Sequence, residues 1–362
     1  MKYDARTLCP ARPTRTLALA TDSGGRFGPA CVALVLAACA TGSEDTRTAA
    51  AVTEPRARSV DPSHFIRDAL LADVTLEERA LSDGTRALCY VIQSRSEPHE
   101  HEMGPWSPKH VTDGADAGGL WMKDGEVHDV DGPFVATIGE LYDDPAWDLV
   151  RDDGSIRVTS TREAFEAAAR PDVDPTYHNH VVEGRPEWVG EKETTYVIPA
   201  QPVFSETPVR LGQGAVGVAF NGVNFDPPAP LHAILAAHTI APLDDSGGHL
   251  NPHTGYHYHA ATGHTREVAQ EDGHAPMIGY ALDGFAIFAH RDERGEEPRD
   301  LDDCGGHSDA TRGYHYHAGA PGSNQLIRAF RGVPGTARVA GDEQARPGPP
   351  PHRPPPREAG GR

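Results

Sequence analysis

A histidine motif that occurs twice constrains the fold of this 362-residue chain more than any other feature. Leu243–Ala260 and Leu301–Ala318 each contain a Gly-Gly-His loop, five variable residues and a Gly-Tyr-His-Tyr-His-Ala segment. The two segments match position for position, and 58 residues separate His249 from its equivalent His307. A repeat of this length predicts one structural unit built twice, with the two copies packed together.

A further segment precedes each copy of the motif, and these two segments also match each other. Gly217–Phe225 carries an Asn-Gly pair and Gly279–Phe288 an Asp-Gly pair, and both pairs tolerate the positive φ of tight hairpin turns. Asp-Gly pairs recur along the chain, and only Arg162–Arg170 is clearly predicted as a helix. The sequence therefore predicts a mainly β fold with few helices. Its antiparallel β-rich domain, residues 201–332, would carry a pseudo-twofold tandem repeat.

Strand geometry gives the histidines of this repeat a common direction. Successive side chains on a β-strand point to opposite faces, so the two histidines of each Tyr-His-Tyr-His segment project together, away from the tyrosines. Two such imidazoles can share a metal ion at about 2.0–2.1 Å, with the Gly-Gly-His histidine as third ligand. The alternative is that these histidines hydrogen-bond to the backbone and stabilise the repeat without metal. The predicted ligands of copper or zinc, in two sites or one shared site, are His249, His257, His259, His307, His315 and His317.

Acidic residues close to the motif suggest supporting roles. Asp283, in the Asp-Gly turn of the second copy, could act as a catalytic general base beside a metal-bound water. Its counterpart in the first copy is Asn221, which cannot take a proton, and both residues are also ordinary turn formers. The aspartates predicted to orient the histidine rings through hydrogen bonds are Asp244, Asp245, Asp302 and Asp303.

Two histidine pairs lie outside the repeat. His99, His101 and Met103 combine imidazoles with a thioether, which suits copper, and His178 and His180 form a further His-x-His pair. These side chains could complete the metal sites of the repeat, or they could have ordinary loop or core roles. The histidines without repeat support, treated as background, are His232, His238, His253, His264, His274 and His290.

The N-terminal segment has the pattern of a bacterial export signal. Pro29–Ala38 is an apolar run too short to span a bilayer of roughly 30 Å, and Cys39 follows it directly. Leu36–Cys39 resembles a lipobox, in which the cysteine is acylated. We therefore expect a signal peptide at 1–38, lipidation at Cys39, and a lipoprotein that faces the periplasm or the cell exterior.

The rest of the chain divides by composition. The predicted parts are a flexible tether at 39–60, a β-rich N-terminal region at 61–200, and a disordered Pro-rich tail at 333–362. Cys89 and Cys304 remain in the mature chain and could form a disulfide in an oxidising compartment, or stay as two free thiols.

Charge and motif content exclude several function classes. The net charge of −20 is incompatible with a nucleic-acid surface or a polybasic membrane patch, so membrane contact is expected only through the lipid anchor. The sequence contains no Walker loop, no dinucleotide fingerprint and no His-Glu-x-x-His motif. A metal-binding protein is the leading hypothesis. The alternatives are a secreted metal-dependent hydrolase or oxidase, and a metal-free surface module.

The doubled Gly-His and Tyr-His-Tyr-His segments, together with Gly279–Phe285, resemble the YHYH-domain family of mostly secreted bacterial proteins. The resemblance covers residues 201–332 and implies export and a domain, but no defined activity. It assigns the family's motif histidines to the same six positions. Ala286, Ala289 and His290 stand where proline and a closing glycine are common in the family. Ser246 occupies the position of Cys304, which argues against a thiolate ligand common to both copies.

Overall fold

A computed structural model describes residues 59–168, 174–184, 186 and 188–341. The predicted signal peptide, the lipidation site Cys39, almost all of the tether and the Pro-rich segment beyond 341 lie outside these described residues. No helix in the described part of the chain is long and apolar enough to cross a membrane.

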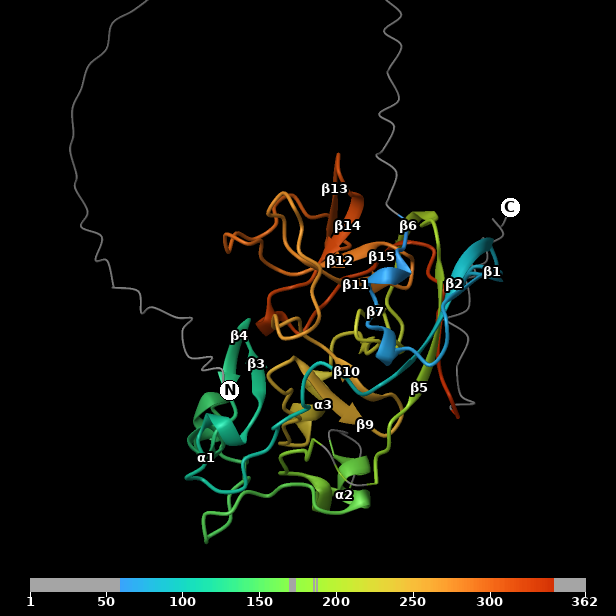
Figure 1. Ribbon diagram of the computed structural model, residues 1–362. Helices are drawn as coiled ribbons and strands as arrows, with labels where there is room; N and C mark the ends of the chain where they lie inside the picture. The colour runs from blue at the N-terminus through green and yellow to red at the C-terminus, as the bar shows by residue number, and fades with distance from the viewer. Residues whose placement is uncertain (1–58, 169–173, 185, 187, 342–362) are drawn as a thin grey trace, which may run out of the picture. The chain divides into compact units, whose positions relative to one another are not determined.

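The tandem repeat forms one continuous eight-stranded sheet (Figure 1). Its strand order is β13-β14-β12-β11-β7-β8-β10-β9, so each copy of the repeat occupies one half of the sheet. In each copy the Tyr-His-Tyr-His strand lies between a parallel neighbour and an antiparallel one. The bounds are β7 (Gly217–Ala219), β8 (Asn224–Phe225), β9 (Gly248–Asn251), β10 (Gly255–Tyr258), β11 (Met277–Ala281), β12 (Ala286–Phe288), β13 (Gly306–Asp309) and β14 (Gly313–His317).

The two halves of the sheet meet where β7 pairs with β11 in antiparallel orientation. Val218 of the first copy lies opposite Tyr280, the equivalent residue of the second copy. A Cβ added at Gly279 would lie 2.2 Å from the carbonyl oxygen of Val218, so the close approach of the strands requires glycine there. β7 and β11 are equivalent strands of the two copies, and their pairing confirms the predicted pseudo-twofold repeat.

A second sheet, with the order β1-β2-β5-β16, joins strands from the start, the middle and the end of the described chain. Its strands are β1 (Thr75–Ala80), β2 (Arg86–Arg95), β5 (Glu193–Pro199) and β16 (Thr336–Val339). The prediction of a disordered tail from 333 is therefore wrong at its start. Val333 is buried beside Leu81 and Cys89, and β16 pairs with β5, so this segment has both a core contact and a strand partner.

The remaining elements are short. Helix α2 ends at Ala167, earlier than predicted, and begins after Thr161, whose hydroxyl accepts a hydrogen bond from the Ala164 amide at 3.1 Å. The other helices and strands are α1 (Gly132–Leu141), α2 (Arg162–Ala167), α3 (Leu231–Ala236), β3 (Leu120–Lys123) with β4 (Glu126–Asp129), β6 (Phe204–Val209) with β15 (Phe330–Gly332), and the 3-10 turns Pro62–His64, Arg67–Ala69, Ala115–Ala117, Pro175–Tyr177 and Pro321–Ser323.

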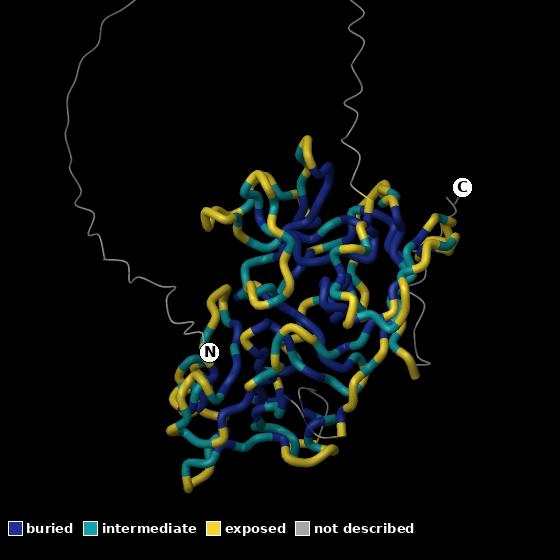
Figure 2. The backbone as a smooth tube through the Cα atoms, in the orientation of Figure 1, coloured by how far each residue is buried: buried dark blue, intermediate teal, exposed yellow. Residues whose placement is uncertain are grey.

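The N-terminal region packs onto the repeat as part of the same compact unit. Ser94 on β2 and Tyr196 on β5 both donate hydrogen bonds to the Gly222 carbonyl, at 2.5 Å and 3.1 Å. Buried residues run through the large sheet and much of β2 and β5, and exposed residues lie at loop ends and along the edge strand β1 (Figure 2). The predicted boundary at residue 200 is therefore a boundary in sequence pattern only, because the residues on its two sides share one core.

The cysteines are not paired. Cys89 and Cys304 are buried free thiols. Cys89 packs with Leu81 and Val333 in a small cluster, whereas Cys304 belongs to the main core of the repeat. The disulfide considered from the sequence is therefore absent, because the two residues belong to different hydrophobic clusters.

Candidate metal centres

The first histidine cluster lies at one end of the large sheet. His249 on β9 is directly opposite His257 on β10, and His259 follows on the same face of that strand. The ring centroids lie 4.6 to 5.0 Å apart, and one ligand atom from each ring lies within 4.8 Å of the others. The three predicted ligands of the first copy thus converge on one point.

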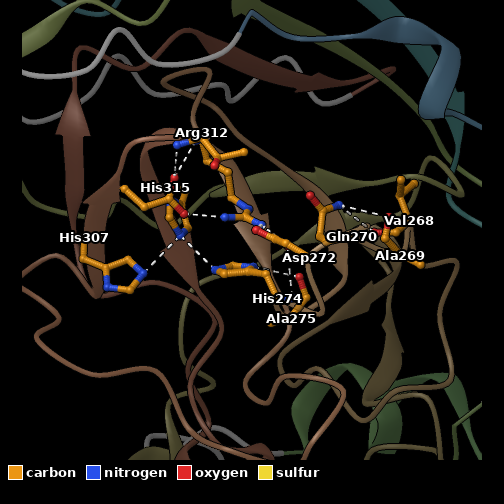
Figure 3. Close-up of polar contacts among 11 residues, drawn as sticks. Val268, Ala269, Gln270, Asp272, His274, Ala275, His307, Arg312 and His315 are labelled. Carbon is orange, nitrogen blue, oxygen red and sulfur yellow. Dashed lines mark hydrogen bonds and ion pairs between the residues drawn. The ribbon is translucent and has the colours of Figure 1, made fainter.

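The second cluster contains one histidine more than predicted. His307, His315 and His317 repeat the arrangement on β13 and β14, and His274 joins them from the loop before β11. The Nε2 atom of His315 lies 3.1 Å from that of His307 and 3.3 Å from that of His274 (Figure 3). β12, β11, β7 and β8 separate the two motif strands, so the clusters are distinct and do not form one shared site.

His274 has no counterpart in the first copy of the repeat, so the sequence alone gives no reason to expect it in the cluster. A buried arginine ties its loop to the motif. Arg312, just before β14, contacts the Asp272 carboxylate at 2.5 and 2.6 Å, and Asp272 lies two residues before His274 (Figure 3). An acidic residue near a histidine is a weak sequence signal, so only the tertiary contact reveals this fourth member.

Six of the seven clustered histidines contact a backbone carbonyl oxygen through their Nδ1 atom. A carbonyl oxygen can only accept a hydrogen bond, so each such Nδ1 must carry the proton, and Nε2 keeps a lone pair that can bind a metal. At His257 the side-chain amide of Asn251 lies 3.4 Å from this Nε2 atom. The structure thus contains the backbone bonds of the metal-free alternative, but they use only one nitrogen of each ring. The Nδ1 bonds are His257 to Gly255 (3.0 Å), His259 to Pro227 (2.8 Å), His274 to Ala275 (3.0 Å), His307 to Arg299 (2.9 Å), His315 to Gly313 (2.9 Å) and His317 to Ala289 (3.0 Å).

Burial favours the neutral form of several of these rings. Burial, with a smaller contribution from neighbouring histidines, lowers the pKa of His259 to about 3, that of His315 to about 4 and that of His317 to about 3. The pKa of His249 is also well below its usual value, mainly through burial. Metal ions bind the neutral imidazole, so at neutral pH these rings need lose no proton to act as ligands.

The aspartates of the motif do not orient the histidine rings, contrary to prediction. Asp244 accepts hydrogen bonds from Tyr256 Oη at 2.8 and 2.9 Å, and Asp302 accepts them from Tyr314 Oη at 2.9 and 3.1 Å. Both carboxylates also accept bonds from amides of their own Gly-Gly loops, and so fix the loops on the tyrosine side. Asp245 and Asp303 are exposed.

Asp283 also faces the tyrosines. Its buried carboxylate accepts hydrogen bonds from Tyr316 Oη at 2.5 Å and from the Gly332 amide at 2.9 Å. Tyr316 points to the face of β14 opposite to the histidines, so this geometry does not support a general base beside a metal-bound water. Burial raises the pKa of Asp283 to about 6. Its twin Asn221 instead donates to Tyr258 Oη, at 2.8 Å.

The outlying candidates stay apart from both clusters in the described part of the chain. The His101 ring lies 6.4 Å from the rings of Tyr256 and Tyr258, on the tyrosine side of β10. Met103 packs against the main core and His99 is exposed. The half-buried His178 and His180 lie in the loop after the Pro175–Tyr177 turn.

Comparison with known proteins confirms the resemblance found in the sequence. Residues 195–300 match the family model described as YHYH protein. The match includes the first motif copy and ends before the second, and it spans less than a third of the chain. No curated protein and no solved structure matched this chain.

Proposed function

We propose that this protein binds transition metal ions, copper or zinc, at its two histidine clusters. The observation that carries the proposal is the convergence of Nε2 lone pairs in the second cluster. The Nδ1 protons of His307, His315 and His274 are given to carbonyl oxygens, so the close Nε2 contacts contain no proton to share. Such lone pairs repel each other unless a cation lies between them.

Burial of the same atoms adds support. The Nε2 atom of His317 is buried without a hydrogen-bond partner, and a buried polar atom left unpaired destabilises the fold. A bound ion would satisfy it. Copper and zinc both suit imidazole ligands, and the cluster offers no thiolate. Because Asp283 faces away from the rings, we favour metal binding over metal-dependent catalysis.

Metal analysis of the full mature chain, purified without a histidine tag, tests this proposal. We expect about two equivalents of copper or zinc per chain, one for each cluster. Removal with a chelator should lower the melting temperature, because an ion that binds only the folded state stabilises it. A protein that holds less than about one tenth of an equivalent and does not rebind either metal would refute the proposal.

We further propose that the protein is exported and anchored by a lipid on Cys39, which would place the clusters outside the cytoplasm. The apolar run before Cys39 supports this proposal. The natural chain should appear in the membrane fraction of the bacterial cell, whereas Cys39→Ser should lose both the lipid and membrane retention. A Cys39→Ser chain that still fractionates with the membrane would contradict the anchor.

A further inference from the structure

A buried carboxylate lies beside the first cluster. Asp226 directly follows β8, which runs parallel to β10, and the register places His257 opposite Asn224 and Tyr258 opposite Phe225. The next residue pair is therefore Asp226 and His259, and Asp226 shares a face with both histidines of the strand. Its Oδ2 atom lies 3.8 Å from His257 Nε2, but Asp226 is outside the group of ligand atoms that all lie within 4.8 Å of one another, so an ion must draw its side chain toward His249 and His259.

Asp226 has the burial and the unpaired oxygen atom that suit a metal ligand. The residue is only 7% exposed, and its Oδ1 atom is buried without a hydrogen-bond partner. Two ligands of a tetrahedral ion with bonds of about 2.1 Å lie about 3.4 Å apart, close to the separation of Oδ2 from His257. A buried carboxylate needs a cation or hydrogen-bond donors nearby.

The second copy has a different residue at this place. Phe288 lies opposite His317 in the parallel pairing of β12 with β14, as Asp226 lies beside His259. The Phe288 ring packs against His274 and His315, with centroid distances of 4.7 and 4.9 Å. The second cluster thus replaces the carboxylate with an apolar wall and gains a fourth imidazole.

We propose that Asp226 is a ligand of the first centre, so that the two centres differ in chemistry. This inference rests on the proposed metal binding. The first centre then offers three imidazoles and one carboxylate, whereas the second offers four imidazoles. A carboxylate adds a negative charge and a hard oxygen donor, which favour Mn²⁺ and Fe²⁺ more than imidazoles alone do. Copper and zinc can bind at both centres, but only the first should retain Mn²⁺.

The experiment is a Mn²⁺ titration of the full mature chain after metal removal, with free Mn²⁺ measured by electron paramagnetic resonance. The natural chain should bind one equivalent. Asp226→Asn should weaken that binding more than about 100-fold, because loss of a direct ligand should exceed the roughly 10–100-fold loss caused by a supporting residue, and leave copper at the second centre unchanged. Asp283→Asn is the matched control, because it removes another buried carboxylate, one that faces the tyrosines. It should bind Mn²⁺ like the natural chain.

The outcomes separate the two proposals. If the natural chain binds no transition metal, the proposed function fails. If copper or zinc binds at both centres and Asp226→Asn matches the control in Mn²⁺ affinity, only the assignment of Asp226 fails. If Asp226→Asn does not fold, infrared difference spectra of chains that keep Asp226 decide the assignment. Metal binding in a His315→Gln chain must then shift a carboxylate band, and metal binding in a His257→Gln chain must not; the absence of this shift overturns the assignment.

Discussion

Replacement of His315 by glutamine should abolish metal binding at the second cluster and leave the first intact, and His257→Gln should do the reverse. His315 contacts two other Nε2 atoms of its cluster, and His257 lies opposite His249. Loss of a residue that only supports a ligand weakens metal binding by about 10–100-fold, so loss of a direct ligand should exceed 100-fold. Glutamine is preferred to alanine because both histidines are almost fully buried and alanine would leave a cavity.

The measurement is the metal content of each variant after equilibration with zinc and gel filtration. The natural chain should retain two equivalents, each single variant one, and the double variant none. His290→Gln is the control, because this half-buried histidine also bonds a carbonyl through Nδ1, at 3.2 Å to Ala318, but belongs to neither cluster. If either single variant lost both equivalents, the two clusters would not be independent sites.

The sequence predicted the fold class and six of the seven clustered histidines because both follow from local rules. Strand alternation gives His257 and His259 one direction, and the repeat extends this inference to the second copy. His274 and Asp226 could not be found in this way. His274 reaches its cluster through a loop held by Arg312, and Asp226 is brought near His257 by the parallel pairing of β8 with β10.

The predicted role of the motif aspartates failed for a related reason. Adjacency in sequence suggested that Asp244 and Asp302 support the following histidines. Each carboxylate instead accepts bonds from amides of its own loop and from a motif tyrosine, so it lies on the tyrosine side. Gly247 and Gly305 have φ values of 84° and 86°, a left-handed conformation that turns each loop before its histidine. The sequence alone does not specify to which face such a turn directs the preceding side chain.

Acid should destabilise the metal-free protein steeply between pH 6.5 and about 4. The pKa values of His259, His315 and His317 are about 3 to 4 in the folded state and about 6.5 in the unfolded chain. In this window the unfolded state binds protons that the folded state excludes, so the free energy of unfolding falls as pH falls. At about 1.4 kcal/mol per pH unit for each group, the loss between pH 7 and 5 is on the order of 5 kcal/mol. This loss is comparable to the whole stability of many domains.

Urea unfolding of the chelated protein at pH 7, 6 and 5 measures this slope. Asp283 acts in the opposite direction: its pKa is raised to about 6, so the stability linked to it is present at low pH and is lost as pH rises through 6. Asp283→Asn should therefore steepen the acid loss. His259→Gln combined with His317→Gln should flatten it, because two of the three titrating rings are gone. An unfolding midpoint that stays constant from pH 7 to 5 would mean that these rings titrate in the folded protein as they do in the unfolded chain. Burial would then not hold them neutral, and below about pH 6.5 they would have to lose protons before binding a metal.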